Sequence, residues 1–140
     1  PEKGAMITRE DYFGRVSHIA APDETTLANA DQLLERVNAL LAVINETHPG
    51  IEAAMKPSVN SGWRPAAYNA TVPNAAVKSK HITGQAIDLA DPDGELDELL
   101  LNHPNLLEMA GLWQEHPLAT KGWCHVQSVP PRSGNRVFYP

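Results

Sequence analysis

The stretch SKHITGQAID at residues 79–88 places a histidine and an aspartate seven positions apart, on either side of a glycine. Two side chains at this spacing cannot meet on adjacent turns of a helix, where spacings of three or four are needed. A loop leading into a strand can bring them together, and Gly84 permits a tight turn. Asp88 lies within the apolar run AIDLA, where a carboxylate needs pairing, hydrogen bonds or a metal ion. The stretch therefore predicts either two ligands of one metal ion or a metal-free turn before a buried strand.

A third ligand would have to come from another strand, and His125 in WCHVQ is the best candidate among the remaining histidines. Strand alternation places Trp123, His125 and Gln127 on one face and Cys124 and Val126 on the other. Free cysteine is among the most buried residue types, so we expect Cys124 to be a small core residue. Because it is the only cysteine, disulfides within the chain and sites built from several thiolates are excluded. A metal ion here would be held by histidine and carboxylate.

Length and charge limit the other functions to consider. A chain of 140 residues with 42% hydrophobic residues is sufficient for one globular domain, which we assign to residues 6–140. The formal charge of −6 gives no basic stripe, so neither nucleic acid nor membrane is expected as a partner. We found no membrane-spanning stretch and no secretory signal, and the opening PEKGA is expected to be a vector-derived remnant.

The apolar pattern predicts an α+β domain. Apolar residues recur at steps of three and four over residues 25–48, which indicates an amphipathic helix. Short strands are predicted near 58–62, over 86–90 and over 123–128, and short helices over 95–101 and 106–113. The segment 66–80 is expected to be a loop or a short helix. This order favours a small, mainly antiparallel sheet flanked by helices.

Three segments, SGWRP at 61–65, SKHITGQAID at 79–88 and WCHVQ at 123–127, carry a family resemblance. In this order they resemble the zinc peptidases related to D-Ala-D-Ala carboxypeptidases and to the hedgehog fold, the LAS metallopeptidases. The resemblance spans residues 58–128, half of the chain. The decapeptide is most similar to that of phage endolysins that cut between L-Ala and D-Glu in peptidoglycan. The resemblance implies a hedgehog/DD-peptidase-like fold.

The resemblance also implies roles for matched residues: zinc bound by His81, Asp88 and His125, with Arg64 binding or polarising the substrate. Zinc with three protein ligands keeps a fourth position for water, lowers the pKa of that water to about 7 and polarises a scissile carbonyl. Arg64 has the planar donors to hold a substrate carboxylate or an oxyanion; the alternative for it is a surface salt bridge.

Ser79 and Gln127 are predicted to orient the metal ligands from behind, a role that metal sites usually require. For Ser79 the alternative is the cap of a turn.

The sequence leaves more than one candidate for the general base. Many relatives place an acidic residue three positions before the last histidine, and here that position is Gly122. Glu115 and His116 precede the last strand and are the candidates to reach the catalytic water from a loop.

These observations predict a zinc peptidase that hydrolyses an amide bond in peptidoglycan stem peptides, of the phage endolysin type. Such a protein is expected to be a monomer made in the cytoplasm without a signal peptide, and to act on the cell wall after release. One alternative is a D-Ala-D-Ala carboxypeptidase or dipeptidase. Another, supported by Gly122, is a non-catalytic zinc-bound module of a phage particle or a wall-binding domain.

Overall fold

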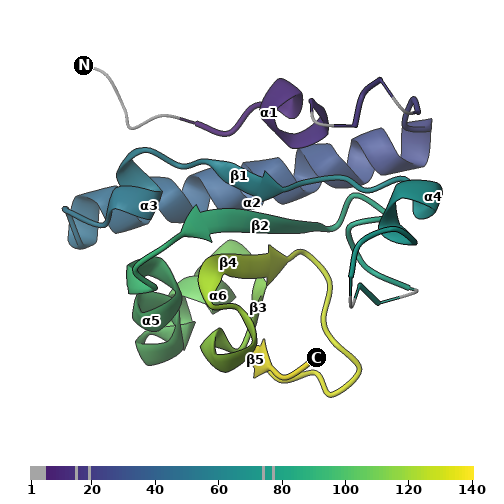
Figure 1. The fold of residues 1–140 in the computed structure, drawn as a ribbon. Helices are drawn as coiled ribbons and strands as arrows, with labels where there is room; N and C mark the ends of the chain where they lie inside the picture. Colours follow the sequence, from purple (N-terminus) through teal and green to yellow (C-terminus); the bar gives the residue numbers. More distant parts are fainter. Residues whose placement is uncertain (1–5, 15, 19, 74, 77) are drawn as a thin grey trace.

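Helices and a central sheet are formed along the whole described part of the chain (Figure 1). The computed structural model of the chain describes residues 6–14, 16–18, 20–73, 75–76 and 78–140. The expected vector remnant, residues 1–5, lies outside these ranges. The described part contains six α-helices and a five-stranded sheet, so the predicted α+β class is confirmed.

The long helix α2, Glu24–Thr47, confirms the prediction for residues 25–48 and runs across the molecule (Figure 1). The carboxylate of Asp23 caps it by accepting a hydrogen bond of 2.7 Å from the backbone N–H of Thr26. Its apolar stripe is buried against the rest of the core at Ala30, Leu33, Leu34, Val37, Leu40, Leu41 and Ile44. Among the described helices, none combines the length and the apolar character needed to cross a membrane.

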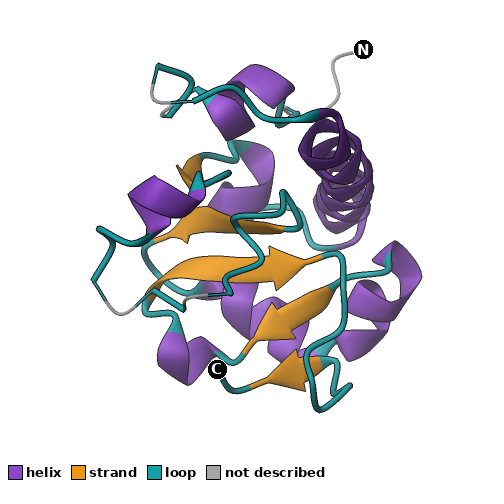
Figure 2. Cartoon of the chain, turned by 90° about the vertical axis from the view of Figure 1, so that its right-hand side faces the viewer, coloured by secondary structure: helices purple, strands orange, loops and turns teal. Residues whose placement is uncertain are grey.

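The five strands form one sheet in the order β1-β2-β4-β3-β5 (Figure 2). Their bounds are Val59–Ser61 for β1, Ala86–Asp91 for β2, Trp113–Glu115 for β3, Gly122–Gln127 for β4 and Val137–Phe138 for β5. The pairs β1–β2, β2–β4 and β3–β4 are antiparallel, and β3–β5 is parallel. The prediction of a mainly antiparallel sheet is therefore confirmed.

The two faces of the sheet differ in character. Ile87 and Leu89 of β2 and Cys124 and Val126 of β4 are at most 2% exposed and belong to one hydrophobic core with α2, α5 and α6. Cys124 is thus the core residue that alternation predicted. Asp88 and His125 alternate with these residues, so they lie on the opposite face.

The shorter helices are α1, Arg9–Phe13; α3, Glu52–Met55; α4, Ala66–Asn69; α5, Glu95–Asn102; and α6, Pro104–Ala110, with a 3-10 turn at Pro117–Ala119. The prediction of a helix over 106–113 is wrong at its end. Gly111 adopts φ +73° and stops α6, after which Trp113 begins β3. The predicted loop or short helix over 66–80 contains α4.

A buried polar contact fixes α5 against β3 and against the segment that leads into β4. The carboxylate of Asp97 accepts hydrogen bonds from Thr120 Oγ1 at 2.6 Å and from Gln114 Nε2 at 2.7 Å. Burial raises the pKa of Asp97, while these two donors act in the opposite direction. The contact joins α5 to two positions about 20 residues further along the chain, and Thr120 lies two residues before β4 begins.

Helix α1 approaches the end of β1 so closely that Gly62 has no room for a side chain. A Cβ atom there would lie 2.1 Å from the carbonyl oxygen of Tyr12. Trp63 donates its backbone N–H to the same oxygen at 3.3 Å, and its ring packs edge-on against Phe13. Gly62 is therefore required by the approach of two backbones.

We expect Gly62→Ala to lower the free energy of unfolding by at least about 2 kcal/mol, because the added methyl group must displace α1 from β1. Urea denaturation measures the loss. Gly134→Ala is the control: Gly134 has φ +77° with nothing within 4 Å of an added Cβ, so only the backbone cost of about 1 kcal/mol applies. Equal losses in the two variants would contradict the close approach.

Candidate metal centre

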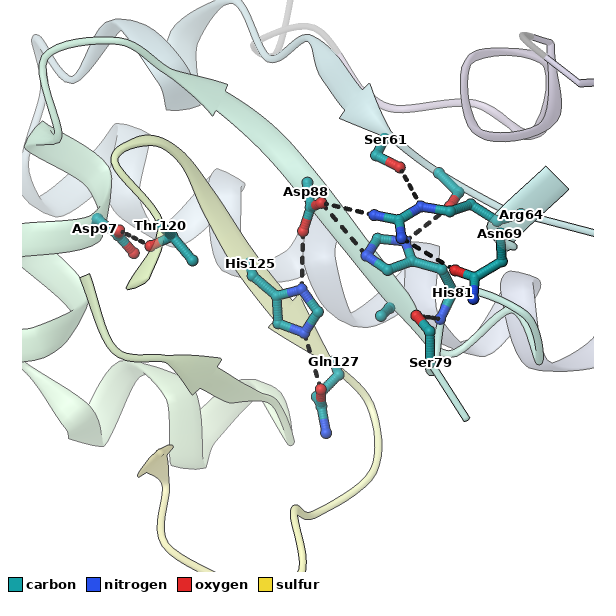
Figure 3. A network of polar contacts seen from close by, with 12 residues as sticks. Ser61, Arg64, Asn69, Ser79, His81, Asp88, Asp97, Thr120, His125 and Gln127 are labelled. Atoms are coloured by element: carbon teal, nitrogen blue, oxygen red, sulfur yellow. Dashed lines mark hydrogen bonds and ion pairs between the residues drawn. The ribbon is translucent and has the colours of Figure 1, made fainter. Parts of the chain in front are cut away.

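His81, Asp88 and His125 lie together and are suited to hold a metal ion (Figure 3). One ligand atom from each residue lies within 4.8 Å of the others. The Nε2 atom of His81 is 3.4 Å from Asp88 Oδ2, and the Nδ1 atom of His125 is 2.8 Å from Asp88 Oδ1. The structure thus brings together the three residues that the sequence assigned to one site.

Strand pairing accounts for two of the three. Asp88 in β2 and His125 in β4 are directly opposed in the antiparallel register, so their side chains leave the sheet on the same face. A shift of one residue would send one of them into the hydrophobic core. The register that buries Leu89 against Cys124 also places this aspartate beside this histidine.

A tight turn before β2 delivers the third residue. Gly84 adopts φ +77°, and an added Cβ would lie 2.8 Å from the carbonyl oxygen of Thr26 at the start of α2. The Ser79 hydroxyl accepts a hydrogen bond from the backbone N–H of His81 at 3.1 Å. Arg64 donates its backbone N–H to the carbonyl of His81, also at 3.1 Å. Ser79 therefore supports the backbone of His81 as a turn cap does, and the predicted tight turn at Gly84 is confirmed.

Hydrogen bonds behind the two imidazoles determine which nitrogens face Asp88. His81 Nδ1 lies 2.8 Å from the carbonyl oxygen of Gly62 and donates to it, so Nε2 is the nitrogen that faces Asp88. His125 Nε2 lies 2.9 Å from Gln127 Oε1. Gln127 donates its amide to the carbonyl of Val129 at 2.9 Å, so its oxygen is turned towards the histidine. Gln127 thus makes the contact expected of a residue that orients a ligand.

The electrostatics of the centre favour a carboxylate. Burial alone would raise the pKa of Asp88, but hydrogen bonds from His125 and His81 outweigh it and hold that pKa below its ordinary value. For His125 burial alone would lower the pKa, but the hydrogen bond and negative charge of Asp88 raise it. Asp88 is therefore ionised and available as a ligand over the physiological pH range.

This donor set fits zinc. Ligand atoms about 2.1 Å from a tetrahedral zinc ion are separated by about 3.4 Å. The His81 Nε2–Asp88 Oδ2 distance equals this value, and the three ligand atoms all lie within 4.8 Å of one another. Imidazole nitrogens and carboxylate oxygens are ordinary zinc ligands, and the nitrogen of each imidazole that faces away from Asp88 lies within 2.9 Å of an oxygen behind it. Three protein ligands leave one coordination position for water or substrate, as in catalytic sites.

Arg64 lies against the same carboxylate. Its Nη2 atom is 3.5 Å from Asp88 Oδ2, and its side chain is 12% exposed. The alternative of an exposed surface salt bridge does not apply to a guanidinium that is nearly buried. Two of its contacts, with Ser61 and Asn69, were not anticipated from the sequence. The only feature of the sequence that could have indicated Ser61 and Asn69 is that both lie within five residues of Arg64.

Glu115 lies on the same face as the triad. The β3–β4 register pairs Trp113 with Gln127 and Gln114 with Val126, and its continuation by one residue leads to Glu115 and His125. Glu115 is half-buried; burial raises its pKa, and the nearby His125 partly offsets that rise. Phe138 is the β5 partner of Glu115, and its ring centroid lies 6.2 Å from that of His125.

His116 is engaged elsewhere. Its Nδ1 atom accepts a hydrogen bond from the backbone N–H of Leu118 at the start of the 3-10 turn. Its ring stacks on Tyr139 with 4.4 Å between centroids. These contacts hold the His116 ring against the 3-10 turn and Tyr139. Of the two candidate bases, Glu115 is the one whose position continues the strand register towards His125.

Gly122 lies away from the triad. With Thr120 and Asp97 it lines a surface pocket of about 360 Å³ beside α5, and a Cβ added at Gly122 would have no described atom within 4 Å. The pocket lies on the side of β4 that carries Cys124. The candidate site is identified by the donor chemistry of His81, Asp88 and His125, and not by this pocket.

We expect His81→Ala and Asp88→Asn each to lower zinc content and melting temperature together, because loss of a ligand removes binding that is linked to folding. Metal analysis and thermal unfolding with and without a chelator measure both effects. Exposed His18 offers the control, since His18→Ala leaves the donor set intact. Unchanged zinc stoichiometry in both ligand variants would reject the assignment.

Comparison of the chain with protein-family models, curated proteins and solved structures gives no match. A functional conclusion for this protein therefore rests on the residues around Asp88 and on their geometry.

Proposed function

We propose that this protein is a zinc-dependent peptidase that hydrolyses an amide bond in peptidoglycan stem peptides. The observation that carries the proposal is the convergence of His81, Asp88 and His125, with Arg64 3.5 Å from the aspartate. This set combines a tridentate metal site with a cationic group beside it. Amide hydrolysis requires an electrophilic centre and a group that stabilises negative charge.

Zinc held by the three ligands would polarise the scissile carbonyl and make a water molecule acidic enough to react near neutral pH. Arg64 binds a carboxylate of the stem peptide or stabilises the developing oxyanion, because its guanidinium is planar and permanently charged. Glu115 lies on β3, next to the strand that carries His125. It accepts the proton of the attacking water and passes it to the leaving amine. Its raised pKa suits both transfers.

The more specific part of the proposal is an L-alanyl-D-glutamate endopeptidase of the phage endolysin type, with a hedgehog/DD-peptidase-like fold. It is supported by the order of the segments SGWRP, SKHITGQAID and WCHVQ, whose side chains meet at one centre. The protein would act on the cell wall after release from the cytoplasm.

Digestion of purified peptidoglycan tests the reaction. The zinc-loaded protein is expected to release fragments with new L-Ala carboxyl ends and new D-Glu amino ends, identified by mass spectrometry. Release of free D-alanine instead would identify a carboxypeptidase. Absence of any cleavage, with zinc bound, would reject both peptidase assignments and leave a non-catalytic zinc-bound module.

We expect Glu115→Gln to lower kcat by about 10²- to 10⁴-fold with zinc content unchanged, because the amide cannot accept the proton. Turnover of a soluble stem peptide and metal analysis measure the two quantities. Glu108→Gln, on an exposed position of α6, is the matched control. Full turnover by the Glu115 variant would place the base elsewhere.

A further inference from the structure

Three different side chains fix the orientation of the Arg64 guanidinium (Figure 3). Its Nε–H donates to Ser61 Oγ at 3.0 Å, Nη1 to Asn69 Oδ1 at 3.2 Å and Nη2 to Asp88 Oδ2 at 3.5 Å. A guanidinium carries five N–H groups. Among the described residues, these contacts engage one N–H on each nitrogen, and the second N–H of each terminal nitrogen has no described partner.

Asn69 is held at both ends of its amide. It is 4% exposed, and while its oxygen accepts from Arg64 its Nδ2 atom donates to the carbonyl of Ala76 at 2.8 Å. A carbonyl on one side and a guanidinium on the other leave only one orientation of the amide that satisfies both partners. The amide thus connects Arg64 to the segment that leads to Ser79 and His81.

We propose that Asn69 is a positioning residue for Arg64. Its oxygen holds Nη1 so that Nη2 stays beside Asp88 and the guanidinium keeps one orientation towards the substrate carboxylate or oxyanion. This inference rests on the proposed function for the identity of the bound group. The contact between Asn69 and Arg64 does not depend on it.

A purely structural role for Asn69 predicts different results. In that case the important contact is the one to Ala76, and the amide only fastens the loop. Asn69→Asp separates the two roles, because an aspartate keeps an acceptor for Arg64 but has no donor for the carbonyl of Ala76. Asn69→Ala removes both contacts.

The first measurement is independent of activity. In ¹H–¹⁵N spectra of the arginine side chains, assigned with Arg64→Ala, wild-type Arg64 is expected to show separate Nη signals because its guanidinium is held. These signals should merge in Asn69→Ala and persist in Asn69→Asp, with zinc content unchanged in both. Thr71→Ala, an exposed position two residues away, is the control and should resemble the wild type.

The second measurement is kinetic. For a soluble stem peptide, Asn69→Ala is expected to lower kcat/KM by about 10- to 100-fold, the effect of losing one hydrogen bond to a charged group. Asn69→Asp should recover most of this loss. In the Arg64→Ala background, Asn69→Ala should cause no further loss, because a residue that acts through Arg64 has nothing left to position.

Three results would overturn the inference: unchanged Arg64 signals in Asn69→Ala, an Asn69→Asp variant as impaired as Asn69→Ala, or additive losses in the double variant. A wild-type protein that cleaves no stem peptide would reject the proposed function instead. The spectra would then still decide whether Asn69 holds Arg64.

Discussion

A carboxylate buried between the strands of a sheet is costly unless several donors or a metal ion compensate for the water it loses. Asp88 is 6% exposed, and His81, His125 and Arg64 all face its two oxygens. Removal of one partner would leave charge or hydrogen-bonding capacity unsatisfied in a place that water barely reaches. The arrangement around Asp88 is therefore a strong constraint on how β2, β4 and the loop before β2 can be placed.

The fold supplies these partners through three separate devices. Antiparallel pairing of β2 with β4 puts His125 next to Asp88. The Gly84 turn, packed on the first turn of α2, brings His81 back over the strand. The segment that follows β1 contributes Arg64. In the same segment, the carbonyl of Gly62 orients the His81 ring. Because Gly62 is pressed against Tyr12, the short helix α1 supports the site although it contributes no ligand.

Much of this arrangement was predictable from local sequence. The helix over α2 follows from its periodicity, and the faces of β4 follow from alternation once the strand is recognised. The strands β3 and β5 could not be predicted, because two or three residues are too few to establish a period. Trp113 was consequently placed in a helix, and Glu115 was expected in a loop rather than opposite His125. Asn69 was missed for a different reason: its partners are Arg64 and a backbone carbonyl, and a carbonyl carries no signal in the sequence.

The position of Glu115 bears on Gly122, the position at which the resemblance led us to expect an acidic residue. Gly122 lines the pocket beside Asp97, and a side chain added there would begin in open space. In this chain a base can instead come from β3, because the β3–β4 register puts position 115 on the His125 face. With the β3–β4 register continued by one residue, the row Ser61, Asp88, His125, Glu115 and Phe138 crosses all five strands. At the β1 end of this row, Ser61 accepts a hydrogen bond from Arg64. At the β3 end lies Glu115, a carboxylate whose pKa is raised by burial. In the proposed reaction, a substrate held by its own carboxylate at Arg64 would present its scissile bond between a fixed cation and a proton acceptor. Strand pairing and the contact of Arg64 with Ser61 together determine this order.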